Sequence, residues 1–208
     1  MLFYYPNRPT LVPPDPKNPL NPAPAYINSL EAGGIYDGAE FKWNGDNTEI
    51  HTDDLSFRNR QGERLHYTPH PDMITELKKF PKKSILNGEL MHRHTKATKD
   101  LLILHCVMAW DGQLLLGKTW GYSRQILEAL AWLPRTVGTQ LSYSSHVLLA
   151  QVHQSGYWKL FNQARGCDDS IEGIVLKNSK GKLVFSTNKI PDVNWMLKIR
   201  KPSKKYSF

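Results

Sequence analysis

The segment Ser170–Lys177 has the sequence Ser-Ile-Glu-Gly-Ile-Val-Leu-Lys and gives the most specific indication of the fold. A glutamate and a glycine precede three apolar residues, and Lys177 closes the run. A short apolar run bounded in this way is typical of a buried β-strand. Glu172 offers the oxygen ligands that a divalent cation prefers, and Lys177 is a candidate phosphate contact. A hairpin strand flanked by solvated charges would show the same pattern.

The last expected strand, Trp195–Arg200, carries two cations on one side. Lys198 and Arg200 alternate with Leu197 and Ile199, and successive side chains of a strand point to opposite faces. Two cations on one face favour an anion beside them, and a nucleotide phosphate would serve. A solvated edge strand, on which lysines discourage aggregation, is the alternative.

Two further pieces combine a charged side chain with a glycine. In Glu40–Asn47 (Glu-Phe-Lys-Trp-Asn-Gly-Asp-Asn), Lys42 ends an expected strand beside a turn whose glycine lets a ligand approach the backbone. Attack of a lysine amine on an α-phosphorus needs the neutral amine, which nearby cations or a metal favour. In Ile85–Leu90, Glu89 lies in an apolar strand, where a carboxylate needs a metal, a ribose hydroxyl or a cation as partner. Each piece alone also fits a solvated side chain.

Hydrophobic periodicity predicts a chain rich in strands, with helices interspersed. Expected strands cover residues 39–42, 47–51, 55–59, 84–91, 100–108, 113–116, 173–178, 183–187 and 195–200. Expected helices cover residues 71–80, 122–133 and 155–165. Because strands and helices do not alternate regularly, the pattern favours an α+β fold over a parallel doubly wound sheet.

Prolines set the first part of the chain apart. Eight of the 14 prolines lie between Pro6 and Pro24, so this part is expected to run extended across a surface and not to form a central strand or helix. Its aromatic start, Phe3–Tyr5, either packs onto the body or belongs to a mobile tail. We therefore divide the chain into a proline-rich N-terminal segment, residues 1–37, and one domain, residues 38–208.

Composition and charge narrow the class of protein. The 208 residues, 40% hydrophobic and 22% charged, fit one moderately large folded domain. No apolar run is long enough to span a membrane, and the N-terminus lacks the features of a secretory signal. Two cysteines, Cys106 and Cys167, are too few for a disulfide framework, which favours a reducing, cytoplasmic compartment. The net charge of +8 suits a nucleic acid as partner.

Taken in chain order, four motifs resemble those of the covalent nucleotidyltransferases. They are Lys-x-x-Gly beginning at Lys42, Leu-x-Gly-Glu ending at Glu89, Glu-Gly-Ile-Val-Leu-Lys beginning at Glu172 and Trp-x-x-Lys-x-Arg ending at Arg200. They are similar to motifs I, III, IV and V of that superfamily, and together they cover Ala39–Arg200. The superfamily comprises ATP-dependent DNA ligases, RNA ligases and mRNA capping enzymes.

This resemblance implies an ATP-dependent polynucleotide ligase built on an α+β nucleotidyltransferase (adenylation) domain. A cleft between antiparallel sheets with flanking helices would bind ATP together with Mg²⁺ or Mn²⁺. Lys42 would attack ATP, release pyrophosphate and hold AMP as a lysyl phosphoamide. AMP would then pass to a 5′-phosphate end, and a 3′-hydroxyl would displace it to seal the strand. A monomer is expected, and small ligases of this kind often accompany phages.

The resemblance also implies which residues bind the nucleotide and the metal. Glu40 is expected to read the adenine amino group, which favours ATP over GTP. Leu55–Gly62 looks like motif Ia, whose arginine contacts the ribose or a phosphate; Arg60 is the first choice and Arg58 the second. Glu172 is an expected metal ligand. Glu89 is expected to contact the metal or the ribose. The other expected contacts of the nucleotide are Phe41, Asn47, Lys177, Lys198 and Arg200.

Several positions depart from the family pattern. Asn44 and Asn87 stand where motifs I and III often have Asp, and Leu104 or His105 replaces the aromatic residue that stacks on adenine. DNA ligases generally have Arg where Asn47 stands, and Lys-x-x-Gly-x-Asn is closer to one branch of RNA ligases. On that ground an RNA ligase is preferred, with a minimal DNA ligase as the alternative.

Only eight residues follow Arg200, too few for the OB-fold that follows this domain in DNA ligases and capping enzymes. A domain without an OB-fold is therefore expected, with the loop His92–Lys99 and the basic tail as candidates for gripping phosphates. Two rival functions stay open. Glu40 disfavours a GTP-dependent capping enzyme, whereas Asn44 and Asn87 favour a catalytically silent nucleic-acid-binding relative.

Overall fold

The computed structural model describes residues 3–12, 24–93, 99–139 and 145–201. Most of the prolines of the N-terminal segment, the centre of the loop His92–Lys99 and the basic tail after Lys201 lie outside these residues. The fold is α+β, with two largely antiparallel sheets and flanking helices, which confirms the predicted class. Within the described residues, no helix is long and apolar enough to cross a membrane.

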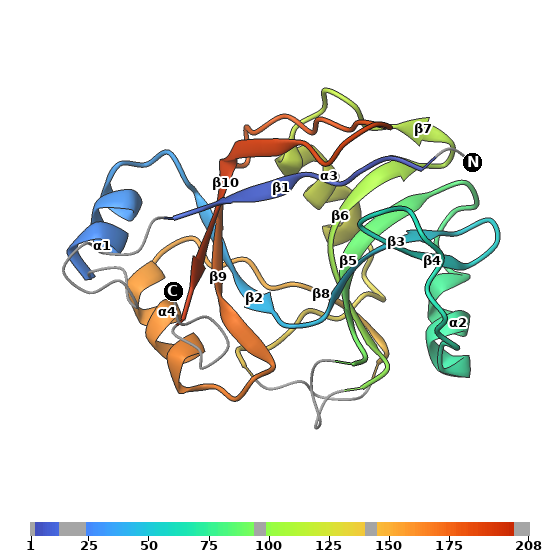
Figure 1. The fold of residues 1–208 in the computed structure, drawn as a ribbon, viewed down its shortest axis with the longest axis horizontal. Helices are drawn as coiled ribbons and strands as arrows, with labels where there is room; N and C mark the ends of the chain where they lie inside the picture. The colour runs from blue at the N-terminus through green and yellow to red at the C-terminus, as the bar shows by residue number, and fades with distance from the viewer. Residues whose placement is uncertain (1–2, 13–23, 94–98, 140–144, 202–208) are drawn as a thin grey trace.

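One sheet has four strands in the order β1-β10-β9-β2 (Figure 1). Its strands are β1 (Arg8–Leu11), β2 (Gly38–Trp43), β9 (Ile171–Lys177) and β10 (Asp192–Arg200). β9 runs antiparallel to both β2 and β10, whereas β1 is parallel to β10. The sheet thus brings the motif I, IV and V segments side by side although they are far apart in the chain.

The second sheet has the order β4-β3-β5-β6-β7, with β8 added beside β6. Its strands are β3 (Asp46–His51), β4 (Ser56–Asn59), β5 (Ile85–Met91), β6 (Leu101–Trp110), β7 (Gln113–Leu114) and β8 (Val147–Leu149). β5 carries Glu89, and β3 follows β2 after a short turn, so this turn links the two sheets directly.

The described part of the chain forms four helices: α1 (Pro24–Ala32), α2 (Pro71–Leu77), α3 (Trp120–Glu128) and α4 (Tyr157–Gly166). α4 lies against the four-stranded sheet and α1 packs on α4, whereas α2 and α3 lie beside the other sheet (Figure 1). Met73 and Leu77 of α2 pack in one core with Leu86 and Leu102. A second core lies under α4 and includes buried Phe41.

The proline-rich segment contributes an edge strand that the sequence did not predict. β1 lies at the edge of its sheet, and its register against β10 shifts between Pro9 and Thr10. Proline has no backbone N–H to donate, so it is tolerated at an edge or a bulge. Arg8 also donates two hydrogen bonds to the Asp192 carboxylate, at 2.6 and 2.8 Å.

Two further differences concern elements outside the motifs. The helix α1, beginning at Pro24, was not predicted, although proline favours the first turn of a helix. The strand expected at Leu183–Thr187 is wrong, because within this described segment the only strand-type contact is the isolated bridge of Ser186 with Tyr5.

Candidate functional site

Cations and carboxylates project from one face of the four-stranded sheet. Lys42 on β2 pairs with Gly173 on β9, which in turn pairs with Arg200 on β10. Glu40 and Lys198 lie two residues along on β2 and β10, in the next row of the sheet. Because alternate residues of a strand share a face, the side chains of Lys42, Arg200, Glu40 and Lys198 are on the same side.

A bulge in β9 adds Glu172 to this row. Lys42 pairs with Gly173 but the next residue, Trp43, pairs with Ile171, so Glu172 is the extra residue of β9. An extra residue of this kind bends the strand and re-aims the side chains beside it. The bulge therefore explains how neighbouring residues of β9 place a carboxylate beside Lys42.

Position 173 requires glycine. Its φ is +150°, and a Cβ there would lie 2.0 Å from the carbonyl oxygen of Ile199. Because Gly173 has no side chain, the row between Lys42 and Arg200 also stays open to a ligand. The close approach of β10 therefore explains why this position of the Glu-Gly-Ile-Val-Leu-Lys motif is a glycine.

Lys42 and Arg200 converge on one carboxylate oxygen. Lys42 Nζ lies 2.5 Å from Glu172 Oε2, and Arg200 Nε lies 3.4 Å from the same atom. The side chains of Lys42 and Glu172 are 19% and 20% exposed, so solvent and a ligand can reach them. Burial, together with the charges of Arg200 and Lys42, lowers the pKa of Lys198. Such a gathering of cations favours the binding of a polyphosphate.

Glu40 lies in the neighbouring row of the sheet, together with Lys198, and is almost fully buried, at 1% exposed. Its carboxylate lies 2.6 Å from Lys177 Nζ, 3.1 Å from His105 Nδ1 and 3.5 Å from Arg124 Nη1. Burial opposes ionisation of Glu40, but these neighbouring groups outweigh it and lower the pKa of Glu40 to about 2. The Glu40 carboxylate is therefore charged at neutral pH and already held by protein groups.

Glu89 faces this row from the second sheet. Its Oε1 accepts a hydrogen bond from the backbone N–H of Gly45 at 3.0 Å, and its Oε2 lies 4.0 Å from His105 Nε2. Burial raises the pKa of Glu89 and Glu172 adds to the rise, although Lys42 opposes it. Two carboxylates that repel one another in this way fit a divalent cation, which takes oxygen ligands.

Gly45 is the point where the turn after Lys42 meets β5. A Cβ at this position would lie 2.5 Å from the carbonyl oxygen of Leu90. The glycine of the Lys-x-x-Gly motif therefore permits close approach of two backbones, whereas the sequence had suggested close approach of a ligand. Asn44 in the same turn donates to the carbonyl of Asp169 at 2.7 Å, which ties the turn to the start of β9.

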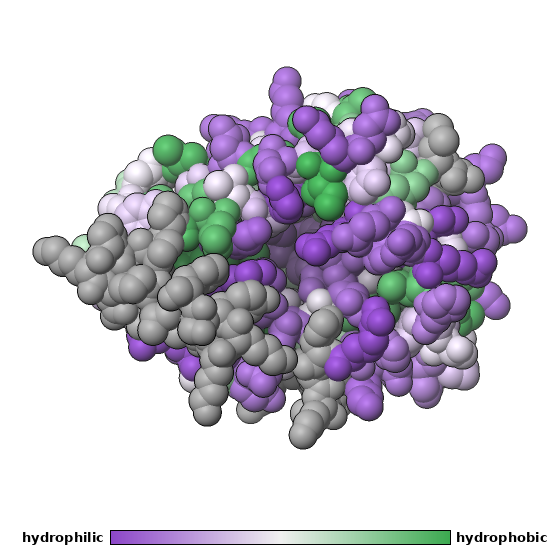
Figure 2. Space-filling view, in the orientation of Figure 1, coloured by the Kyte–Doolittle hydropathy of each residue, from purple (hydrophilic) through white to green (hydrophobic). Residues whose placement is uncertain are grey.

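We call Glu40, Lys42, Glu89, Glu172, Lys198 and Arg200 the charged site. The structure brings all six together from four strands, β2, β5, β9 and β10. His105 is the link between the two sheets, because its ring nitrogens approach both Glu40 and Glu89. In Figure 2, hydrophilic side chains surround a hollow near the middle of the face, between the positions of β9 and β5 in Figure 1.

Other residues expected at the nucleotide lie differently. Phe41 is 3% exposed and packs in the core on the opposite side of β2 from Lys42, so its side chain does not face the charged site. Lys177 is buried against Glu40 and lies 4.8 Å from the centre of the Trp120 ring. Asn47 accepts a hydrogen bond from Asn87 at 3.2 Å.

The two arginines of the expected motif Ia differ in position. Arg60 is exposed, in the turn that follows β4. Arg58 pairs with Glu49, which pairs with Asn87 on β5, so Arg58 lies on the face of the second sheet that also carries Glu89. Arg58 further donates to the carbonyl of Gly62 at 3.1 Å. By position alone, the second choice is the arginine that faces the site.

Two residues of the site received no role from the sequence. His105, the polar interruption of an apolar strand, faces the charged site, whereas Leu104 is buried in the opposite core. Arg124 is 4% exposed on α3, and its guanidinium also donates to the carbonyl of Ala150. The signal for Arg124 is its helical spacing from Trp120 and Leu127, which places it on the buried face of an amphipathic helix.

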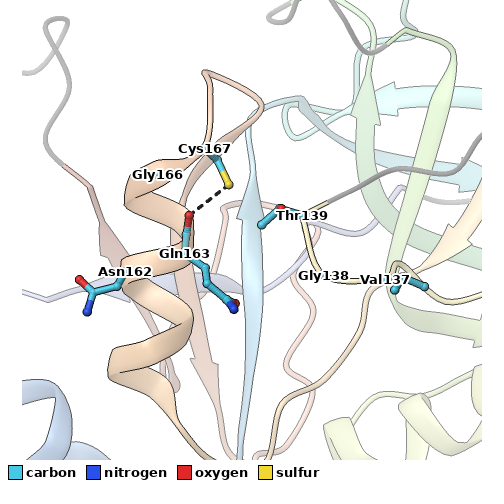
Figure 3. Close-up of a pocket in the computed structure, with 7 residues that line it drawn as sticks. All are labelled: Val137, Gly138, Thr139, Asn162, Gln163, Gly166 and Cys167. Carbon is cyan, nitrogen blue, oxygen red and sulfur yellow. Dashed lines mark hydrogen bonds between the residues drawn. The ribbon is translucent and has the colours of Figure 1, made fainter.

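A separate hollow of about 440 Å³ lies between α4 and residues 137–139 (Figure 3). It is lined by Val137, Gly138, Thr139, Asn162, Gln163, Gly166 and Cys167. Among these described lining residues none is charged, and the Cys167 thiol is hydrogen-bonded to the carbonyl of Gln163 at 3.1 Å. This hollow therefore offers no groups for phosphate chemistry, in contrast to the charged site.

Comparison with known proteins identifies the fold. The ligase domain of LigD from M. tuberculosis matches with a TM-score of 0.56 at 16% identity, over 78% of this chain and 53% of that chain. A Lig E DNA ligase matches with a TM-score of 0.53 at 11% identity, over 82% of this chain and 65% of that chain. The ATP-dependent DNA ligase of bacteriophage T7, solved with ATP, matches with a TM-score of 0.51 at 12% identity, over 94% of this chain and 68% of that chain.

The chain thus has the ligase-type nucleotidyltransferase fold that its motifs resemble. It spans about half of the length of the LigD ligase domain. No protein-family model matches the sequence, and no curated protein matches it either. At sequence identities of 11–16%, the likeness establishes the fold alone. The activity depends on the residues of the charged site.

Proposed function

We propose that this chain is the nucleotidyltransferase domain of an ATP-dependent polynucleotide ligase and that Lys42 becomes adenylylated. The observation that carries the proposal is the position of the Lys42 amine, 2.5 Å from Glu172 and on the same sheet face as Lys198 and Arg200. A nucleophile, a proton acceptor and two phosphate-binding cations have little use together in a protein that only binds nucleic acid.

In the proposed reaction, Lys42 Nζ forms a bond to the α-phosphorus of ATP as the bond to the β-phosphate oxygen breaks and pyrophosphate leaves. Glu172 Oε2 accepts the proton that the ammonium group of Lys42 must lose. Lys198 and Arg200 bind the α-phosphate and stabilise the charge that develops on its oxygens. The neutral amine is the attacking form, because the ammonium group has no lone pair with which to form the bond.

Glu40 and Lys42 then contact different parts of ATP. Glu40 lies two residues before Lys42 on the same face of β2, so the adenine is directed to the Glu40 end and the phosphates to the Lys42 end. His105 and Arg124 orient the Glu40 carboxylate for reading the adenine amino group. Any contact of Phe41 with the nucleotide passes through its backbone, because its side chain is in the core.

The metal would be held by Glu172 and Glu89. Mg²⁺ commonly takes one or two carboxylates and keeps several waters, and both carboxylates face the charged site. Bound there, a divalent cation supplies charge neutralisation of the phosphate oxygens.

The adenylylated lysine would pass AMP to a 5′-phosphate end, which a 3′-hydroxyl then attacks with loss of AMP. Asn47 favours RNA as the joined strand. The LigD, Lig E and T7 structures are those of DNA ligases, which favours DNA. Sealing assays on nicked RNA and nicked DNA, at equal concentrations and in direct competition, decide between the two substrates.

The proposal is tested by incubating the protein with ATP and Mg²⁺ or Mn²⁺. Intact mass spectrometry should show one added AMP, and peptide mapping should place it on Lys42. Lys42→Ala should abolish the adduct, whereas Lys159→Ala, which removes an exposed lysine of α4, should leave it unchanged. GTP should label far more weakly than ATP. Wild-type protein that gains no AMP with either metal would end the claim.

A further inference from the structure

A second cluster of metal-ligand residues lies where the N-terminus of α2 meets the segment that leads into β8. It consists of His70, Asp72 and His146, each of which offers one ligand atom within 4.8 Å of the others. The rings of His70 and His146 stack, with centroids 4.1 Å apart and planes inclined by 11°. Two imidazoles and a carboxylate are donors that zinc and its neighbours in the first transition row prefer.

His146 is held in the tautomer that a metal requires. Its Nδ1 lies 2.6 Å from the carbonyl oxygen of Asp100. A carbonyl accepts hydrogen bonds and does not donate them, so Nδ1 carries the proton and Nε2 of the neutral ring keeps its lone pair. Metal-binding histidines commonly donate their other ring N–H to a backbone carbonyl in this way.

The distance between the ligand atoms of His70 and Asp72 is already close to the distance between two ligand atoms of one zinc ion. His70 Nδ1 lies 3.5 Å from Asp72 Oδ2. Zinc bonds of about 2.0–2.1 Å in a tetrahedral arrangement place ligand atoms roughly 3.3 Å apart. The same nitrogen accepts the backbone N–H of Asp72 at 3.3 Å, a long hydrogen bond that a metal bond would readily replace.

Glu76, one turn further along α2, fixes the two ligand segments against each other. Its carboxylate accepts hydrogen bonds from the backbone N–H groups of His146 and Val147, at 3.0 and 2.7 Å, and from the Ser145 hydroxyl at 2.9 Å. This frame fixes the backbone of the two ligand segments, so binding requires only that the two imidazole side chains turn out of their stack to bring both lone pairs to one ion. The Glu76 contacts hold the segments together without using the histidine side chains.

We propose that His70, Asp72 and His146 bind one Zn²⁺ ion, with water in the remaining coordination position. Magnesium and manganese prefer oxygen ligands, so a site with two imidazoles discriminates against the cations expected at the charged site. Because zinc binds the folded chain and not the unfolded chain, it stabilises the folded state, in which α2 and the segment before β8 meet.

This zinc site is separate from the charged site. Met73 and Leu77 of α2 pack on the face of the second sheet that carries Leu86 and Leu102. Glu89 pairs with Ile103, so the two side chains share a face of the sheet. This face is the one opposite to the face that α2 covers. Loss of zinc is therefore expected to leave self-adenylylation with Mg²⁺ intact.

The test is isothermal titration of ZnCl₂ into untagged protein that has been stripped with a chelator, in buffer containing Mg²⁺. Wild type should bind one Zn²⁺ per chain. His70→Ala and His146→Ala should each weaken binding at least about tenfold, in line with the loss of a ligand. His66→Ala, which removes an exposed histidine outside the cluster, is the matched control and should bind as wild type.

A second measurement separates loss of the site from loss of the fold. Without zinc, the His70→Ala and His146→Ala proteins should have circular dichroism spectra and melting temperatures close to those of wild type. Zinc should raise the melting temperature of wild type and of His66→Ala, but not that of the two cluster variants. The proposal is overturned if wild type binds no zinc, or if the His70→Ala/His146→Ala double variant binds it as tightly as wild type.

Discussion

Two carboxylates of the charged site, Glu40 and Glu172, each lie against cations but differ in their exposure to solvent. At one end of this site, Glu40 is 1% exposed and lies among Lys177, His105 and Arg124. At the other end, Glu172 is 20% exposed and lies against Lys42 and Arg200. Only one residue of β2, Phe41, lies between Glu40 and Lys42, so the difference arises from what packs around each side chain and not from the strand itself.

The difference shows how one sheet face combines rigidity with reactivity. At the Glu40 end, α3 and β6 cover the carboxylate, and a buried charge held by several partners is expensive to disturb. At the Lys42 end, the ion pair is partly solvated and therefore weak, so the amine is free to exchange Glu172 for a substrate. In the proposed function, the buried carboxylate Glu40 orients the nucleotide, and the more exposed Lys42 carries out the reaction.

The exposed end should depend most on the bulge at Gly173. Gly173→Ala is expected to lower the free energy of unfolding by more than about 4 kcal/mol, or to prevent folding, because the Cβ would overlap the Ile199 carbonyl. Gly166→Ala, with no atom near its Cβ at the end of α4, should stay within about 1 kcal/mol of wild type. Urea denaturation measures both. Equal stabilities of the two variants would contradict the role given to the bulge.

The contrast between the two carboxylates is measured directly by removing each one. Glu40→Ala should cost about 3–5 kcal/mol of unfolding free energy, since it leaves Lys177 buried without its carboxylate and Arg124 paired with Glu128 alone. Glu172→Ala should cost about 1 kcal/mol or less, because its ion pairs are partly solvated. Denaturation at neutral pH is the measurement. A larger loss for Glu172→Ala than for Glu40→Ala would reverse the comparison.

Acid should weaken the buried end. The pKa of Glu40 falls from its ordinary value of 4.5 to about 2 on folding, so the stability that its charge contributes is present above about pH 4.5 and is lost as the pH falls towards 2. The unfolding free energy of wild type should drop by a few kcal/mol over that range, to order of magnitude. In Glu40→Ala this portion of the acid dependence should be missing. An unchanged acid profile in the variant would assign the effect to other groups.

The smallest effect concerns Glu89, whose pKa is raised by burial and by Glu172 although Lys42 opposes the rise. A carboxyl with a raised pKa destabilises the folded state as the pH rises above its ordinary value. Glu89→Gln keeps an acceptor for Gly45 and should raise the unfolding free energy at pH 7 by up to about 1 kcal/mol. Glu63→Gln, an exposed control, should change it by less than about 0.5 kcal/mol. A destabilised Glu89→Gln protein would show that the charge is needed for folding.

The sequence predicted the α+β class and most elements that carry the motifs, because their apolar periodicity and glycines are local signals. Strands 39–42, 84–91 and 195–200 correspond to β2, β5 and β10. It did not predict β1, because pairing of a proline-containing edge strand depends on the distant strand β10. It did not place Phe41 either, since the choice of face on β2 depends on which side α4 covers.

The sequence by itself determined the motif order and the strands that carry Lys42, Glu89 and Arg200. These follow from steric and periodic rules that act over a few residues. Only the tertiary structure decided that Glu40 is buried among three partners while Lys42 stays accessible, and that His70 meets His146. Burial and charge depend on neighbours from distant segments, and a linear sequence does not contain those distances.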